Sequence, residues 1–195
     1  MKEKMQRTYS AASYLGVAWG LCMEARVDQP QEESFLLRKG LNKELLDEMV
    51  PIGYFCSHFF LEDPEQVDVS LLLGNQTFDA RVSDRRQSTS GIEYLEVACI
   101  EDQQEHRSRT EMLASGIGSI KRSSTDVFDL INAIIEKKAP KDYPKNTVLL
   151  MFNKLVYPEA LYRDFEFEHA WKFRPLLDGT FLHAFIVDRE KMIRL

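Results

Sequence analysis

The chain has 195 residues, of which 44% are hydrophobic and 29% are charged, so it falls in the ordinary globular class with room for one substantial core. Its formal net charge of -6 at pH 7 excludes attraction of nucleic acid by the surface as a whole, although local basic clusters could still contact phosphate. The three cysteines lie far apart in apolar stretches and show neither a disulfide framework nor a zinc spacing. We therefore expect a single domain over residues 1–195, in a reducing, cytoplasmic compartment.

The N-terminal stretch has two interpretations. A basic start, MKEKMQR, precedes the apolar run TYSAASYLGVAWGLCM, as in a secretory signal. Glu3 interrupts the basic region, however, and apolar residues recur at spacings of three and four, the period of a packed helix. This stripe consists of Met5, Tyr9, Ala12, Gly16, Trp19 and Met23. Between a targeting signal and a packed helix over residues 8–23 we favour the helix, and no run reaches the length of a membrane span.

Helical patterns continue to about residue 62 and define an N-terminal helical part, residues 1–62. The stretch NKELLDEMVPIGYFCSHFF predicts one or two helical pieces, with Asn42 as a candidate cap and Pro51 as a kink. From Val67 the apolar period changes to two, and Gly74-Asn75 supplies a turn. The sequence therefore predicts a β-hairpin after the helices.

The remaining segments mix strands and helices. The strand-like run IEYLEVACI leads into EDQQEHRSRTEMLASG, which suits an exposed helix. STDVFDLINAIIEKK has the terminal charges and apolar stripe of an amphipathic helix, and TVLLMFN is typical of a strand covered on both faces. FEFEHAWKF and TFLHAFIVD, on either side of Asp178-Gly179, predict a C-terminal β-hairpin within residues 154–195.

This order of elements predicts a fold class. Helices come first, followed by three strands, two helices, one strand and a hairpin, which favours an α/β (α+β mixed) fold with a central mixed β-sheet flanked by helices. A doubly wound parallel sheet is not expected. The core of the fold would span residues 63–153.

Two acids lie on neighbouring predicted strands, Asp79 in TFDARV and Glu96 in LEVAC. Two such carboxylates at one end of a sheet can hold a hard divalent cation. The segment from about Asn42 to Asn153 resembles the PD-(D/E)xK superfamily of restriction-endonuclease-like nucleases, in which a helix precedes a hairpin carrying the Asp and a third strand carries Glu-x-Lys. The resemblance implies a restriction-endonuclease-like core that binds Mg²⁺ or Mn²⁺ through Asp79 and Glu96 and hydrolyses phosphodiester bonds of DNA or RNA.

The chain departs from that motif at Ala98, where the family has its lysine. In the family this lysine orients the attacking water and stabilises charge on the phosphate. Either the protein is a degenerate relative that does not cleave, or another side chain supplies the missing group, for which Gln103, Gln104 and Lys121 are the candidates. Glu48, on the helix before the sheet, is a candidate third metal ligand, as in some family members.

Simpler interpretations exist for these and other motifs. Asp79 could be an ordinary surface acid, because alternate residues of a strand share one solvated face. The loop GIGSIKRSS could cradle a phosphate, and His106, Arg107 and Arg109 could touch a nucleic-acid backbone, but we favour solvated segments for both. His169 and His183 could pair across the terminal hairpin, and we favour a structural role for them.

The alternative function is a non-catalytic protein-interaction or self-associating module on the same scaffold. The missing lysine, the acidic surface and the aromatic stripe of the predicted C-terminal hairpin favour it, because an apolar hairpin can bind a partner or form a homodimer through strand pairing. The stripe consists of Phe165, Phe167, Trp171 and Phe173. It could also stack on bases.

Overall fold

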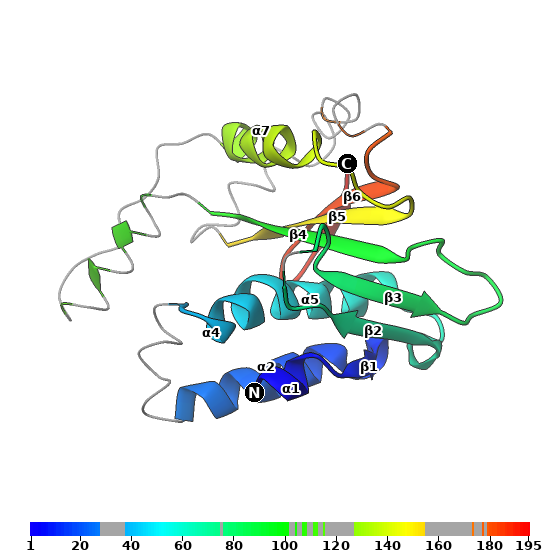
Figure 1. Ribbon diagram of the computed structural model, residues 1–195, viewed down its shortest axis with the longest axis horizontal. Coiled ribbons are helices and arrows are strands. Elements are labelled where there is room, and N and C mark those ends of the chain that lie inside the picture. Colours follow the sequence, from blue (N-terminus) through cyan, green and yellow to red (C-terminus); the bar gives the residue numbers. More distant parts are fainter. Residues whose placement is uncertain are drawn as a thin grey trace.

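The structure is a computed structural model, and it describes residues 1–27, 38–74, 76–101, 104, 107–108, 111–112, 115, 127–154, 173, 177 and 179–195. Within these residues the molecule has three layers, with a twisted sheet between helices on its two faces (Figure 1). The sheet contains seven strands in the order in which they occur in the chain. They are β1 (Thr8–Ser10), β2 (Val67–Leu71), β3 (Ala80–Asp84), β4 (Tyr94–Ile100), β5 (Thr147–Asn153), β6 (His183–Val187) and β7 (Met192–Arg194).

The sheet is mixed, as the sequence predicts. The pairs β1–β2, β2–β3 and β3–β4 are antiparallel. β4, β5 and β6 run parallel to one another, and β7 returns antiparallel to β6. The predicted β2–β3 hairpin and the strand β4 are confirmed. All seven residues of β5 are buried, because β4 and β6 flank it and helices cover both its faces.

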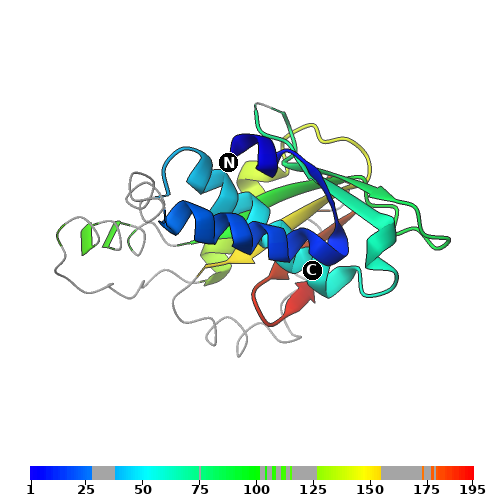
Figure 2. The same cartoon turned by 90° about the horizontal axis from the view of Figure 1, so that it is seen from below.

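Helices cover the two faces unequally. α2 (Ala11–Val27) and α5 (Val50–Phe59) lie on one face and are in front of the sheet when it is seen from below (Figure 2). α7 (Val127–Lys138) lies on the opposite face, where its buried Ile131 and Ile135 pack against β5 and β6 (Figure 1). Short elements complete the fold: α1 (Lys2–Met5), α4 (Leu41–Glu44), the π-helical turn η1 (Leu45–Met49) and the 3₁₀ turn η2 (Pro64–Gln66).

The N-terminal segment is a packed helix, but its buried face is not the predicted one. α2 begins at Ala11, after the short strand β1, and buries Tyr14, Ala18, Leu21, Cys22 and Ala25. Most of the predicted stripe faces outward: Ala12 and Gly16 are exposed, as are Trp19 at 37% and Met23 at 58%. Both faces of this run are apolar, so the period alone could not decide which face packs. No described helix is long and apolar enough to cross a membrane.

The predicted kink at Pro51 takes the form of the π-helical turn η1. Pro51 has no amide hydrogen for the carbonyl of Asp47, four residues earlier, so a regular α-helical hydrogen bond cannot form there. The chain widens instead, and the Val50 amide bonds to the Leu45 carbonyl, five residues back. Cys99 Sγ donates to the Asp47 carbonyl at 3.5 Å. Asn42 is not the cap, since it is buried within α4 and Gly40 occupies the N-cap position.

The chain ends in a β-hairpin, but β6 and β7 form it and not the two predicted strands. The predicted strand TFLHAFIVD contains β6, which pairs with β5 on one edge and with β7 on the other. Both edges of β6 are therefore occupied, and FEFEHAWKF cannot be its hairpin partner. The residues of that predicted arm lie outside the described part of the chain except Phe173, which is buried and stacks on Phe128 of α7.

Candidate functional site

The two predicted acids lie close enough to interact electrostatically, where β3 separates from β4. The paired residues of these strands end at Ala80 and Leu95, and the Asp79 amide donates to the Leu95 carbonyl at 2.8 Å. Two residues further along β4, the Asp79 side chain makes the contact: its Oδ2 accepts the Val97 amide hydrogen at 2.7 Å. The Asp79 carboxylate thus takes the place of the next backbone acceptor in the pairing of β3 with β4. Asp79 is half-buried by this contact and is not an ordinary surface residue.

Glu96 is buried, at 4% exposure, on the face of β4 that α7 covers. Its carboxylate forms an ion pair with the ammonium of Lys138, the last residue of α7. Tyr143 Oη donates to the same oxygen, Oε1, at 3.2 Å, and Lys138 Nζ also lies 3.4 Å from the Val97 carbonyl oxygen. A lysine from a helix therefore lies beside the two acids, and the position two residues after Glu96 on β4 is Ala98.

The β4–α7–β5 crossover explains how Lys138 reaches this position. β4 and β5 are parallel, so α7 must run back across the sheet and end near the strand beginnings. Glu96 is the third residue of β4, and Tyr143 lies in the connection that leads from α7 into β5. The topology thus brings together residues that are more than 40 positions apart in sequence.

Glu48 approaches Asp79 from η1, and three contacts hold that turn in place. The neighbouring Asp47 pairs with Lys154, just after β5, and lies 3.8 Å from Arg38 Nη1. Arg38 in turn donates to both carboxylate oxygens of Glu101, just after β4, at 2.9 and 3.0 Å. These ion pairs tie η1 to the ends of both central strands, so the position of Glu48 relative to the sheet is fixed.

Electrostatics couple the three acids. Burial, together with the carboxylates of Asp79, Glu44, Asp47 and Glu96, raises the pKa of Glu48 to about 8. Burial and Glu96 raise the pKa of Asp79 to about 6, against the opposing effects of the Val97 amide and Lys138. Burial and Glu96 also raise the pKa of Tyr143. Near neutral pH, Glu48 therefore holds a proton while Asp79 is mostly ionised.

The donor chemistry of the acid pair fits a hard divalent cation, because both ligands are carboxylates. Each acid makes its described contacts through a single oxygen, Oδ2 of Asp79 and Oε1 of Glu96. Within the described residues, however, no three carboxylate, histidine or cysteine side chains converge closely enough to hold a metal ion. The structure thus brings Glu48 near the pair without completing a three-ligand set.

Most of the other candidates from the sequence lie outside the part of the chain that the structure describes. Gln103 and Lys121 lie outside the described residues, as do the loop GIGSIKRSS, His106, Arg109 and His169. Gln104 is exposed beyond the end of β4. His183 Nδ1 lies 2.8 Å from Nη2 of Arg194 on β7, and burial and then the guanidinium lower the pKa of the imidazole. Lys138 and Tyr143 are the site residues that sequence reasoning missed.

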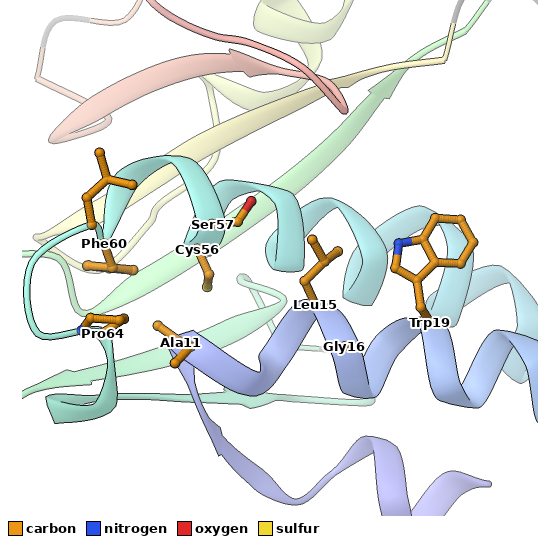
Figure 3. Close-up of a pocket in the computed structure, with 10 residues that line it drawn as sticks. Ala11, Leu15, Gly16, Trp19, Cys56, Ser57, Phe60 and Pro64 are labelled. Carbon is orange, nitrogen blue, oxygen red and sulfur yellow. The ribbon is translucent and has the colours of Figure 1, made fainter.

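A pocket of about 520 Å³ lies away from the acids, between α2 and α5 (Figure 3). α2 contributes Ala11, Leu15, Gly16 and Trp19, and the opposite wall carries Cys56, Ser57, Phe60 and Pro64. None of the residues that line it is an acid, a base or a histidine. It offers mainly apolar contact, and Cys56 and Ser57 are its residues with a thiol or hydroxyl side chain.

Comparisons with models of known protein families, with curated proteins and with solved structures found no match for this chain.

Proposed function

We propose that this protein is a metal-dependent nuclease that hydrolyses phosphodiester bonds at the Asp79–Glu96 pair. The observation that carries the proposal is the ion pair between Lys138 and Glu96, next to Asp79. Two acids at a strand separation and an ammonium group are the chemical groups that the PD-(D/E)xK resemblance calls for, with the lysine supplied by α7 in place of the strand. The group that Ala98 lacks is therefore present from another element.

Each residue has a separate part in this proposal. The Val97 amide fixes Asp79 at 2.7 Å, so one carboxylate oxygen is oriented before any substrate binds. Lys138 places a positive charge where a phosphate would gain negative charge, and Tyr143 helps to orient Glu96 through its hydroxyl at 3.2 Å. Glu48, protonated near neutral pH, is the group that can hold a proton beside Asp79.

Asp79 and Glu96 are the residues that would hold Mg²⁺ or Mn²⁺. A bound cation of this kind would lower the pKa of a coordinated water and polarise the phosphate. The protein's own contribution is to keep both acids and the ammonium of Lys138 in one partly dry site, since Glu96 is 4% exposed. In the free protein Lys138 neutralises Glu96, which offsets the cost of burying that carboxylate.

The test is cleavage of labelled single- and double-stranded DNA and RNA with Mg²⁺ or Mn²⁺, using the wild type, Asp79→Asn, Glu96→Gln and Lys138→Met. We expect metal-dependent cleavage that each substitution lowers by about 10²- to 10³-fold. Lys137→Met is the matched control, because Lys137 is the exposed neighbour of Lys138 on the same helix end. It should cleave like the wild type, and circular dichroism should show that all variants are folded.

A second variant tests whether cleavage needs the ammonium group of Lys138. Ala98 lies on the same face of β4 as Glu96, so Ala98→Lys combined with Lys138→Met returns an ammonium to the site from the strand. Partial recovery of cleavage would support a chemical role for Lys138. Absence of cleavage by the folded wild type on every substrate would refute the nuclease and favour the non-catalytic interaction module.

A further inference from the structure

An aromatic pair with a cation lies beside the two acids. The rings of Phe78 and Tyr94 have centroids 4.4 Å apart and are tilted by 50°. The guanidinium carbon of Arg81 lies 5.8 Å from the centroid of the Tyr94 ring. Both rings are half-buried and Arg81 is exposed, so the cluster is accessible to a ligand. We call Phe78, Tyr94 and Arg81 the aromatic cluster.

The aromatic cluster shares a face of the sheet with the acids. On β4, Leu95 and Val97 point into the core beneath α2 and α5, so Tyr94 and Glu96 point to the opposite face. Residues two apart on one strand lie about 7 Å from each other. Phe78 immediately precedes Asp79 in the chain, and its ring contacts that of Tyr94. The aromatic pair therefore adjoins both acids.

Among the described residues, this part of the face has no cover. Burial alternates along β2 and β3, whose core-facing residues are buried while Arg81 and Ser83 on the other face are exposed. α7 lies over β4 to β6, and no described helix covers β2 and β3 on this side (Figure 1). A flexible polymer can therefore lie across the β2–β3 surface and reach Glu96 from the side of Tyr94.

We propose that the aromatic cluster stacks on an unpaired base and selects single-stranded nucleic acid as the substrate of the Asp79–Glu96 site. This inference rests on the proposed nuclease function and names its substrate class. A base offers a flat π-face to an aromatic ring whatever its sequence, and an arginine adds a cation–π contribution. In a duplex both faces of each base are already stacked on neighbours, so the contact requires a single strand.

The test measures binding separately from cleavage. The probes are a fluorescein-labelled single-stranded DNA, the corresponding RNA, the same DNA as a duplex, and a strand of equal length in which most bases are abasic sites. Fluorescence anisotropy with Glu96→Gln, which is not expected to cleave, would give each Kd. Single strands should bind at least tenfold more tightly than the duplex and than the abasic strand, because the latter keeps the phosphates but not the bases.

The variants are Tyr94→Leu and Phe78→Leu in the same background. Each should weaken single-strand binding by about 5- to 150-fold, the loss of one stacked base, and leave abasic-strand binding unchanged. Tyr94→Phe keeps the ring and should bind like the parent. Trp19→Leu is the matched control, because this exposed aromatic lies on α2, on the opposite side of the sheet.

The outcomes separate this inference from the proposed function. Wild-type cleavage of duplex and single strand at equal rates, or equal binding of abasic and intact strands, would refute base stacking by the aromatic cluster. Neither result would refute the proposed nuclease function. Base-dependent binding without any wild-type cleavage would refute the nuclease function but would support base stacking by the aromatic cluster. The inference would also be overturned if Tyr94→Leu bound single strands as tightly, and with the same preference over the duplex, as Trp19→Leu does.

Discussion

Asp79 Oδ2 accepts the Val97 amide hydrogen at 2.7 Å, directly beside the buried Glu96. This contact makes Asp79 both a structural and a candidate catalytic residue, and two substitutions separate the roles. Asp79→Asn keeps an oxygen acceptor for the Val97 amide and removes the charge, whereas Asp79→Ala removes both. In the free protein the charge costs stability above pH 6, because burial and Glu96 raise the pKa of Asp79 to about 6.

We therefore predict that Asp79→Asn is at least as stable as the wild type at pH 7.5 and loses cleavage. Asp79→Ala should lose about 1 to 3 kcal/mol of unfolding free energy, the cost of an unsatisfied buried amide. Urea unfolding followed by circular dichroism measures both. Equal stability of the two variants would show that the contact does not hold β4 in place.

Glu48 should make stability depend on pH in the opposite sense to a salt-bridged acid. Its pKa rises from about 4.5 to about 8 on folding, so the native state binds a proton that the unfolded chain releases. Stability should then fall as pH rises from about 4.5 to 8. Glu48→Gln should raise Tm at pH 8, with a gain that shrinks toward pH 4.5. Thermal melts across this range measure it, and a gain independent of pH would contradict the coupling.

Removal of Lys138 alone should be more damaging than removal of the whole ion pair. Lys138→Met leaves Glu96 buried without its cation, which costs about 3 to 5 kcal/mol at neutral pH. Lys138→Met combined with Glu96→Gln should recover most of that loss. A double-mutant cycle by chemical denaturation gives the coupling energy, and additive effects of the two substitutions would argue against a direct contact.

Asp84 should protect the protein against acid. It accepts hydrogen bonds from Arg86 and from the amide and hydroxyl of Ser90, and these contacts hold its pKa far below the usual range. A depressed pKa contributes stability above pH 4 that is lost as the pH falls. Asp84→Asn should therefore lose about 1 to 3 kcal/mol at pH 7 and progressively less as the pH falls below 4 toward the depressed pKa of the folded state. A loss that stays constant from pH 7 down to about pH 2 would refute the assignment.

The sequence predicts the elements better than it predicts their partners. The apolar run of β5 and the stripe of α7 are long enough to fix both the element and its buried face. The strand period of TFLHAFIVD is equally clear, but a period of two does not encode which strand lies alongside, and β6 pairs with β5 and β7. α2 is apolar on both faces, so its stripe could not be oriented without knowledge of the packing.

In the candidate site, too, local patterns predict some residues, whereas others depend on how the elements are arranged. Asp79 and Glu96 were predictable because each lies at a strand with a local pattern. Lys138 was not, because its role depends on the crossover that brings the end of α7 above the beginning of β4. Lys137 and Lys138 in the last helical turn suit the helix dipole in any fold, so nothing local distinguishes the lysine that binds Glu96 from its exposed neighbour.

The widened turn Leu45–Met49 makes the approach of Glu48 sensitive to chain length more than to side-chain identity. Deleting one residue there would remove the extra residue of the turn and rotate everything before it by about 100° relative to α5. The Glu48 side chain would then point away from Asp79 while the apolar residues of α5 kept their places. A lineage could thus acquire or discard this third acid through a single-codon insertion or deletion, without altering any residue of the sheet.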